Sequence, residues 1–382
     1  GGGGAPIVGS IQATKPGLPG LNLGAVQPGQ QQQQQQQRSF ETPSILNLED
    51  IQMSNEDWAK QYDPDNDENN YHLPHHIYKQ LKLNHFRQKC SEVLPGKLFI
   101  SSFQVSADLS RLQQEGITHI VNAAGDICES KFPEHFKYLT YYLKDSNNED
   151  ISLLFYKTLE WIDQAIDSGG RVLVHCREGV SRSATMVIAY LMWKFDLSFD
   201  AAHEQLRQVR PICNPNTGFT CQLFLLGKKL KKRAASVAEE EEGQEEDPDE
   251  ARGGSKMQPS LFRVAPYHPK EPFLLVLPAQ TSDPVLDPRF GWVIQCGQHL
   301  FLWIGPRTPN RQAVHDAVVQ HVHWLSVFEN TNCTLEVVEE GSKQGAFWDL
   351  LHRLSPEAQD LVGLSSSFDE DFKLLSTAPT TI

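Results

Sequence analysis

The sequence RVLVHCREGVSRS, residues 171–183, predicts a strand, a short loop and a helix in direct succession. Its aliphatic start is typical of a buried strand, and a helix is expected from about Arg182 to about Lys194. The strand ends at a thiol, Cys176, and Arg182 follows after five intervening residues. In such a loop the backbone N–H groups turn inward, and the helix adds the positive end of its dipole. We therefore predict an anion-binding loop between the strand and the helix.

The side chains of this loop suit a phosphate group beside a nucleophile. Gly179 relieves the steric cost of a sharp turn, and Arg182 can offer a planar fork to two phosphate oxygens. The same positive field stabilises the thiolate of Cys176, which can attack a bound phosphorus in line. An ordinary buried cysteine is the alternative, but it leaves Arg182 and the small polar residues unexplained. We predict Cys176 as the nucleophile and, as phosphate-binding residues, Arg177, Glu178, Gly179, Val180, Ser181 and Arg182.

Two neighbours of these residues are candidates for further catalytic roles. His175 can donate a hydrogen bond into the loop and fix its shape, although a lone histidine on a strand can equally be a core residue with satisfied hydrogen bonds. Ser183 can hydrogen-bond the cysteine sulfur and ease its release from a thiophosphate, although serine is also common in a first helical turn. We predict that both side chains take part in catalysis.

A leaving alkoxide or phenoxide needs a proton donor. Residues 143–150, LKDSNNED, form a polar loop directly after a predicted strand. A parallel neighbouring strand would bring this loop to the sheet edge that carries Cys176. Asp145 is predicted to be the general acid and, later, the base that activates water. Asp150 precedes a long predicted helix and fits an N-cap better, and ordinary loop or cap roles for all these acids remain the alternative.

Strands and helices alternate on both sides of the phosphate loop, which is typical of an α/β fold with a mostly parallel sheet. The helix at 151–167 has a broad apolar face and ends at two glycines, as a helix packed on a sheet does. The strands are predicted at 97–100, 117–122, 138–143 and 171–174, and the helices at 105–114, 151–167, 182–194, 201–208 and 218–230.

Composition divides the 382 residues into five segments. The first is rich in Gly, Pro and Gln, with an unbroken glutamine tract at 30–37, and should be largely disordered. An acidic, self-repelling linker separates two folded units. The predicted segments are 1–87 (disordered), 88–233 (α/β domain), 234–258 (linker), 259–356 (a smaller α+β domain) and 357–382 (a flexible tail).

Charge, hydropathy and cysteine content exclude several classes of protein. The net charge of −14 disfavours a nucleic-acid binder. No run of 18 apolar residues is found, so no membrane-spanning helix is predicted. The seven cysteines contain no Cys-x-x-Cys pair, which disfavours a zinc cage or a disulfide scaffold and indicates a reducing compartment. We expect a cytoplasmic protein, with the nucleus as a further compartment, and no metal.

The predicted site residues match a family signature. His175, Cys176, Arg182 and Ser183 fit His-Cys-x5-Arg-Ser/Thr, and residues 88–233 resemble the dual-specificity protein tyrosine phosphatases. The resemblance implies the cysteine-phosphatase fold and a cysteinyl-phosphate intermediate that water hydrolyses without a metal or cofactor. Further similarity lies at 170–176, 182–185, 189–192 and 214–219.

The loop composition and the domain size favour a protein substrate. Lipid-directed relatives carry lysines inside the loop, whereas this loop has Glu178 and, as its only added cation, Arg177. A polyanionic inositol head group would therefore meet a carboxylate. Compact members of the family accept phosphothreonine as well as phosphotyrosine, and the resemblance implies both for this chain.

The second unit, 259–356, is similar to one gelsolin-like repeat, on residues 300–305, the helix after Asn310 and residues 337–347. Gly291 and Gln312 stand where that family has acidic calcium ligands, so calcium binding is not expected. Because the repeat is a single one, actin binding is not expected either. The order of the two domains resembles the mitogen-activated protein (MAP) kinase phosphatases. The resemblance therefore implies a phosphorylated MAP kinase as the partner.

Alternatives remain open at this point. A phosphoprotein-binding adaptor that acts through 259–356 is one, and sulfur transfer or arsenate reduction on a similar loop is another. The cations at 228–233 could serve docking or nuclear import, or could simply suit a helix C-terminus. Weaker docking candidates are 45–58 and 79–83. Cys128, Cys213 and Cys221 could trap an oxidised Cys176 or could be inert.

Overall fold

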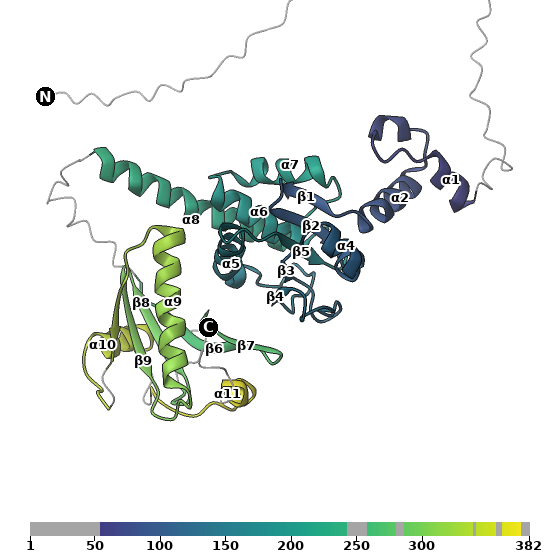
Figure 1. The fold of residues 1–382 in the computed structure, drawn as a ribbon. Coiled ribbons are helices and arrows are strands. Elements are labelled where there is room, and N and C mark those ends of the chain that lie inside the picture. Colours follow the sequence, from purple (N-terminus) through teal and green to yellow (C-terminus); the bar gives the residue numbers. More distant parts are fainter. Residues whose placement is uncertain (1–53, 243–257, 280–285, 339–340, 357–360, 376–382) are drawn as a thin grey trace, which may run out of the picture. The chain divides into compact units, whose positions relative to one another are not determined.

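The computed structural model describes residues 54–242, 258–279, 286–338, 341–356 and 361–375. The predictions for 1–53, which include the glutamine tract and most of the segment 45–58, lie outside these residues, as does the linker at 243–257. The helices and strands from Asn55 onward belong to one compact unit. They build two sheets, each with its own helices (Figure 1).

The first sheet has five strands in the order β1-β2-β5-β3-β4. Only the edge strand β1 is antiparallel to its neighbour, and the pairs β2–β5, β5–β3 and β3–β4 are parallel. Every residue of the central strand β5 is buried, as expected for a sheet covered on both faces. The predicted mostly parallel sheet is thus confirmed. Its strands are β1 Ser91–Leu94, β2 Leu98–Ser102, β3 His119–Asn122, β4 Lys137–Thr140 and β5 Val172–Cys176.

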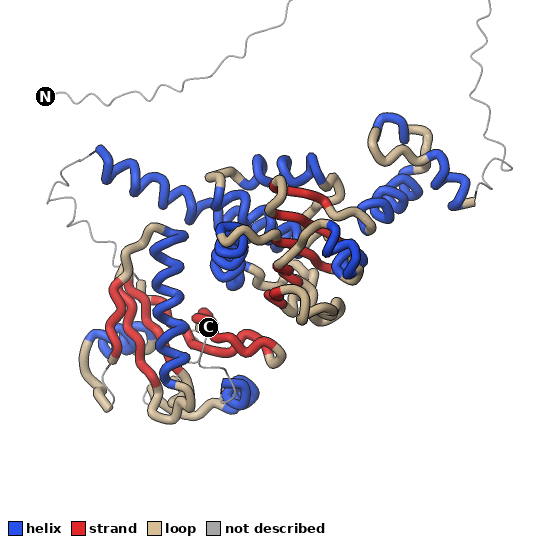
Figure 2. Tube along the Cα trace, viewed as in Figure 1, coloured by secondary structure: helices blue, strands red, loops and turns tan. Residues whose placement is uncertain are grey.

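Helices flank this sheet, and the boundaries of two of them differ from the expectation (Figure 2). The helix expected at 105–114 is interrupted at Asp108, whose side chain caps the second piece by accepting the Arg111 N–H at 3.1 Å. The last helix runs to Glu242 instead of ending near 230, because residues 234–242 are mostly the strong helix formers Ala and Glu. The elements are α3 Phe103–Ser106, α4 Leu109–Gln114, η3 Ser152–Leu154, α5 Phe155–Asp167, α6 Arg182–Lys194, α7 Phe199–Val209 and α8 Thr217–Glu242.

The N-terminal expectation requires a correction, because residues 55–87 contain helices instead of disordered chain. Phe86 is buried, and Leu73 is buried as well. The rings of Tyr62 and Tyr78 lie 6.3 Å apart. These scattered apolar contacts stabilise a segment whose overall composition is polar. Its elements are α1 Asn55–Gln61, η2 Asp67–Asn70 and α2 His75–Arg87.

The second sheet has the order β10-β9-β8-β6-β7, with β10 parallel to β9 and the other pairs antiparallel. Its long helix, α9, buries Val314 and Val318 completely. Beyond residue 357, where a flexible tail was expected, α11 is formed and its Asp371 binds Arg263 at 2.7 Å. The elements are β6 Ser260–His268, β7 Glu271–Pro278, β8 Gly291–Cys296, β9 His299–Ile304, α9 Arg311–Glu329, β10 Thr334–Val337, α10 Ala346–Leu354, η5 Ser366–Phe368 and α11 Asp369–Leu375.

The second sheet and α9 contact helices of the first domain. The rings of Tyr156 and Phe328 stack with centroids 4.9 Å apart. The Trp324 indole N–H donates to Glu160 Oε2 at 2.8 Å. Phe328 and Trp324 are both buried and belong to the same apolar cluster as the core around α5 and α6. The two folded parts therefore share one apolar cluster.

Candidate active site

The loop between β5 and α6 surrounds the predicted nucleophile. The Cys176 side chain is almost fully buried, its Sγ lies 3.2 Å from Ser183 Oγ, and the Gly179 N–H donates to it at 3.3 Å. Gly179 has φ +70°, and a Cβ there would lie 2.5 Å from the Ser101 carbonyl oxygen. Only glycine fits this turn without strain. Two donors therefore lie beside the sulfur, an arrangement that stabilises negative charge on it.

Arg182, the first residue of α6, is buried beside the same loop. Its Nη1 donates to the Leu143 carbonyl oxygen at 3.0 Å, and its Nε lies 3.7 Å from Asp145 Oδ2. Among the described residues the buried Nε has no hydrogen-bond partner. A guanidinium with an unused donor at the base of an anion loop can bind a phosphate oxygen.

The two candidate acids lie in different surroundings. Asp145 Oδ1 accepts from Ser181 Oγ at 2.7 Å and from Asn216 Nδ2 at 3.0 Å, so this carboxylate lies at the phosphate loop. Asp150 Oδ1 instead accepts from the N–H of Ser152 at 3.1 Å and from its hydroxyl at 2.6 Å. Asp150 therefore caps the turn η3, and only Asp145 meets the loop that carries Cys176.

His175 lies behind the nucleophile, fully buried. Its Nδ1 lies 3.3 Å from Ser106 Oγ and 3.4 Å from the Cys176 carbonyl oxygen. Burial lowers the pKa of His175 to about 4, so the ring is neutral at physiological pH. A neutral imidazole can donate one N–H to these oxygens and thereby fix the backbone at Cys176.

The Glu178 side chain is turned to α2. Its carboxylate accepts from Arg87 Nε at 2.5 Å and from Arg87 Nη2 at 2.9 Å, and Arg177 Nε lies 3.6 Å away. This pairing neutralises the carboxylate that was expected to repel a polyanionic head group, so that part of the case for a protein substrate is weakened. Because the side chain of Glu178 is turned to α2, only its backbone N–H is available to bind a phosphate. The side chains of Val180 and Ser181 line the cleft.

Arg210 was not predicted, although it holds the phosphate loop from below. Its side chain is fully buried, its Nε donates to the Gly179 carbonyl oxygen at 2.8 Å, and its Nη2 donates to that of Glu178 at 3.1 Å. Nη1 reaches the Lys89 carbonyl oxygen at 3.1 Å. Fixing these carbonyl groups keeps the opposite N–H groups turned toward the anion. The sequence shows only an arginine near a helix end, so no local signal identifies this role.

Asn216 and Gly218, in the run that carries part of the family resemblance, support the loop of Asp145. Besides binding Asp145, Asn216 donates its own backbone N–H to Ser181 Oγ at 3.2 Å. At Gly218 an added Cβ would lie 2.1 Å from the Asn147 carbonyl oxygen. The close approach of these two segments therefore requires glycine.

A cleft of about 680 Å³ lies at the loop. Cys176, Arg182 and Asp145 line it together with residues of α2, which include Lys79 and Lys82. The residues 79–83 that were a weak docking candidate thus lie beside the cleft. Lys82 is engaged by Asp67 at 2.5 Å, whereas Lys79 is exposed.

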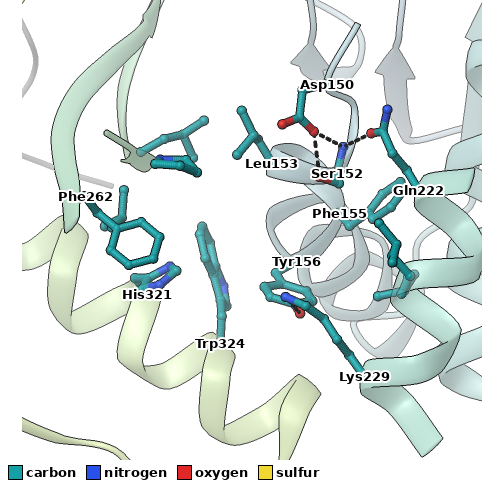
Figure 3. Close-up of a pocket in the computed structure, with 15 residues that line it drawn as sticks. Asp150, Ser152, Leu153, Phe155, Tyr156, Gln222, Lys229, Phe262, His321 and Trp324 are labelled. Atoms are coloured by element: carbon teal, nitrogen blue, oxygen red, sulfur yellow. Dashed lines mark hydrogen bonds between the residues drawn. The ribbon is translucent and has the colours of Figure 1, made fainter. Parts of the chain in front are cut away.

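A second cavity, of about 270 Å³, lies away from the nucleophile (Figure 3). Phe262, His321 and Trp324 line one side of it, and Tyr156 and Lys229 line the other. Asp150, bound to Ser152 as described, also lines this cavity. None of the predicted phosphate-loop residues lines it.

The described ranges contain neither a metal-binding cluster nor a membrane-spanning helix. No cluster of three or more His, Cys, Asp or Glu side chains suited to a metal ion is found there. In the same ranges no helix combines the length and apolar character needed to cross a membrane.

Comparisons with known proteins agree with this geometry. Residues 98–229 match the family described as "Dual specificity phosphatase, catalytic domain". The chain is 31% identical over 285 residues to "Protein-tyrosine-phosphatase MKP1" of Arabidopsis thaliana, which covers 73% of this chain and 33% of that protein. That stretch is longer than 98–229, so the likeness continues beyond the catalytic segment.

Two further relatives match over about as many residues as the family model does. "Dual specificity protein phosphatase 4" of Homo sapiens is 40% identical over 133 residues, 35% of this chain and 33% of that protein. "MAP kinase phosphatase with leucine-rich repeats protein 3" of Dictyostelium discoideum is 43% identical over 141 residues, 37% of this chain and 16% of that protein. The chain thus spans a third or less of the length of these three relatives. The segment 98–229, which carries the Cys176 loop, is thus similar to a dual specificity phosphatase catalytic domain.

Proposed function

We propose that this chain is a cysteine-dependent phosphatase that removes phosphate from phosphotyrosine and phosphothreonine of protein substrates. The observation that carries the proposal is the position of Cys176 Sγ, 3.3 Å from the Gly179 N–H, in a cleft that also holds Arg182 and Asp145. The family match of residues 98–229 supports it independently.

In the first step the Cys176 thiolate attacks phosphorus. The S–P bond forms as the P–O bond to the leaving oxygen breaks, and Asp145 gives its proton to that oxygen. Arg182 and the loop N–H groups hold the remaining phosphate oxygens and stabilise the charge that they carry in the transition state. The products are the free hydroxyl of the substrate and a cysteinyl phosphate.

In the second step water attacks the phosphorus of the cysteinyl phosphate. Asp145, now a carboxylate, takes a proton from this water as the P–O bond forms. The S–P bond breaks, and the electron pair returns to Cys176. The hydroxyl of Ser183, 3.2 Å from the sulfur, stabilises the departing thiolate by hydrogen bonding, and inorganic phosphate leaves.

Phosphorylated MAP kinases are the substrate class that the relatives favour. The Dictyostelium relative carries "MAP kinase phosphatase" in its name. Within the loop no lysine is present to meet additional phosphates of an inositol head group. A folded kinase presents its phosphorylated residues on a loop, which can enter an open cleft of about 680 Å³.

Replacing the nucleophile tests this proposal. Cys176→Ser should abolish hydrolysis of p-nitrophenyl phosphate and of a doubly phosphorylated MAP kinase, because an alkoxide is not available at neutral pH. The variant should still bind the phosphorylated kinase, and it should not bind the unphosphorylated kinase. The control is Cys221→Ser, an exposed thiol, which should hydrolyse both substrates at the wild-type rate. Turnover by Cys176→Ser would contradict the mechanism.

We further propose that residues 259–356 form a gelsolin-like domain without its calcium site. The support is the five-stranded sheet with the long helix α9 packed against it. At Gly291 an added Cβ would lie 2.3 Å from Val314 Cγ1, so no carboxylate fits there. Gln312 Nε2 donates to Asp316 at 2.7 Å. Calcium at 1 mM should leave the Tm of the full chain unchanged by calorimetry, and a calcium-dependent rise would contradict the proposal.

We infer a reducing compartment, the cytoplasm with the nucleus as a further location. None of the seven cysteines, all of which lie in described residues, forms a disulfide. Of the cations at 228–233, Lys229 binds Glu329 at 2.8 Å, which removes it from a freely exposed import signal. Imaging of a fluorescent fusion tests the inference, and accumulation in a secretory compartment would contradict it.

A further inference from the structure

The loop that carries Asp145 is held from the second sheet as well as from its own domain. The backbone N–H of Tyr142 donates a hydrogen bond to Tyr267 Oη at 3.0 Å. Tyr267 belongs to β6 and is 125 residues away in the chain. Since Tyr142 is three positions before Asp145, this bond fixes the chain just after β4 and before the acid.

The residues on either side of Tyr142 are fixed as well. The Tyr141 N–H donates to the Asn122 carbonyl oxygen at 2.7 Å, which continues the pairing of β3 and β4. The Leu143 carbonyl oxygen accepts from Arg182 at 3.0 Å. Each of these three consecutive residues thus has a hydrogen-bonded anchor: the sheet, the second domain and Arg182. Removing the middle hydrogen bond leaves the backbone of Tyr142 less tightly held between the other two.

The Tyr267 ring has little freedom to move. It packs edge-on against Tyr141, with centroids 5.9 Å apart, and stacks on Phe273 at 5.0 Å. Next to it, the His268 ring stacks on the Tyr142 ring at 4.0 Å. Aromatic pairs on both residues 141 and 142 therefore align the two segments, and the hydroxyl of Tyr267 is placed by packing.

The pairing of β6 with β7 is irregular at this residue. Pro266 pairs with Leu274 and His268 with Glu271, so Tyr267 alone faces two residues of β7 and lies opposite a β-bulge. Such bulges are common beside functional sites. Burial also raises the pKa of Tyr267, so its hydroxyl is neutral at physiological pH. The oxygen of a neutral tyrosine hydroxyl accepts hydrogen bonds, here from the Tyr142 N–H.

We propose that Tyr267 is a positioning residue for the general acid: by holding the Tyr142 N–H, the second domain sets where Asp145 meets the leaving oxygen. The inference rests on the proposed function of Asp145. If Tyr267 has this role, the second sheet contributes to the departure of the leaving group by positioning Asp145. This contribution requires no further ligand or partner.

The test is Tyr267→Phe in the full chain, assayed with two aryl phosphates. A poor leaving group needs the proton of Asp145 most, whereas p-nitrophenolate leaves readily without it. We expect kcat/KM to fall about fivefold for phenyl phosphate and less than about twofold for p-nitrophenyl phosphate, because a displaced acid retains part of its effect. A loss of folded protein lowers kcat/KM equally for phenyl phosphate and for p-nitrophenyl phosphate. The ratio of the two kcat/KM values is therefore unaffected by such a loss.

Two matched variants separate positioning from interface stability. Glu329→Ala removes a contact of the same interface, the hydrogen bond that the Tyr156 hydroxyl donates to Glu329. This residue is far from the acid loop in sequence, so the variant should leave the ratio unchanged. In an Asp145→Asn background, Tyr267→Phe should cause no further change in the ratio, because the group that it positions has lost its function.

Several outcomes would overturn the inference. An unchanged ratio in Tyr267→Phe would show that the hydroxyl does not position the acid, and so would an equal loss with both substrates. An additional change in the Asp145→Asn background would show that Tyr267 acts on something else. If Cys176→Ser retained turnover, the proposed function would fail together with the inference, whereas a wild-type ratio in Tyr267→Phe would overturn the inference alone.

Discussion

At the scale of single residues, the proton donor is the most discriminating feature of the site. Two aspartates of the same loop have separate tasks, because Asp145 meets Ser181 of the phosphate loop and Asp150 meets the backbone of its own turn. The difference lies in their hydrogen-bond partners and not in their residue type.

Asp145 and Asp150 give a prediction and its control. Asp145→Asn should lower kcat/KM for phenyl phosphate about 100-fold, since an amide cannot donate the required proton. The loss should be much smaller for p-nitrophenyl phosphate. Asp150→Asn should leave both values unchanged, because an asparagine oxygen caps a turn about as well as an aspartate oxygen. Steady-state kinetics with the two esters check this, and equal losses from both variants would contradict it.

Arg210 leads to a second prediction at this scale. Arg210→Lys removes the fork that binds the carbonyl oxygens of Gly179 and Glu178, and a lysine cannot satisfy both. The phosphate loop should lose its fixed shape, so inhibition by inorganic phosphate should weaken about tenfold, as expected for the loss of one charged hydrogen bond.

The control for Arg210 is its neighbour in sequence on α7. Arg207 is exposed, so Arg207→Lys should leave phosphate inhibition unchanged. Inhibition constants measured with one substrate compare the two variants. Wild-type inhibition in Arg210→Lys would show that the loop keeps its shape without the buried guanidinium.

The nucleophile, arginine and acid of the proposed mechanism could be predicted from sequence because the signals for them are local. Cys176, Arg182 and Ser183 belong to one strand–loop–helix unit, and Asp145 follows the end of a neighbouring strand. The contacts of Arg210 and Tyr267 span 31 and 125 residues, respectively. No periodicity or composition of their own segments indicates such partners.

At the scale of elements, α2 is a wall of the cleft. Its last residue, Arg87, binds Glu178, and its carbonyl oxygen accepts from Ser102 Oγ at 2.5 Å. The helix therefore touches both β2 and the phosphate loop. Sequence reasoning assigned 1–87 to disorder because polar residues dominate the segment, whereas a few buried or half-buried side chains such as Phe86 are enough to dock a short helix.

This contact predicts a defect in substrate binding. In Arg87→Met, Glu178 keeps its negative charge and loses its closest cation, so a phosphate dianion is repelled. KM for p-nitrophenyl phosphate should rise about threefold with little change in kcat, as expected for an interaction with bound substrate and transition state alike. Lys97→Met, which changes net charge equally at an exposed site, is the control. An unchanged KM in Arg87→Met would refute this role.

At the scale of the whole molecule, stability should depend on two histidines, the buried His175 and the half-buried His321. Burial lowers the pKa of His175 to about 4, and burial lowers the pKa of His321 to about 4 as well. In the unfolded chain each has a pKa near 6.5. Between pH 6.5 and 4 the unfolded chain therefore binds protons that the native protein does not. Stability should be complete above pH 6.5 and fall on acidification, by up to about 1.4 kcal/mol per pH unit for each histidine.

Urea denaturation at pH 7, 6 and 5 checks this dependence. His321→Gln removes one of the two groups and should make the fall in the free energy of unfolding less steep. His135→Gln, at an exposed position, should leave the steepness at the wild-type value. If His321→Gln and the wild type lost stability equally, burial of His321 would not be linked to folding.

The architecture could be anticipated only in part at this scale. Alternation of strands and helices predicted the parallel sheet, because a βαβ unit is encoded within a few tens of residues. The boundaries at 87, 234 and 357 were misplaced, since α2 lies before the first, α8 crosses the second and α11 follows the third. Composition indicates only the average polarity of a segment. Whether a helix packs on the domain depends on individual contacts, such as the ion pair of Arg263 with Asp371.

The side chain of Arg182 has two roles. The same guanidinium faces the phosphate loop and keeps the Leu143 carbonyl oxygen in place, two residues before Asp145. A substitution of Arg182 therefore affects phosphate binding and departure of the leaving group simultaneously. A loss of activity in such a variant cannot be assigned to one of these two effects alone. A replacement of Arg182 that preserves phosphate binding must therefore also keep the Leu143 carbonyl oxygen in place.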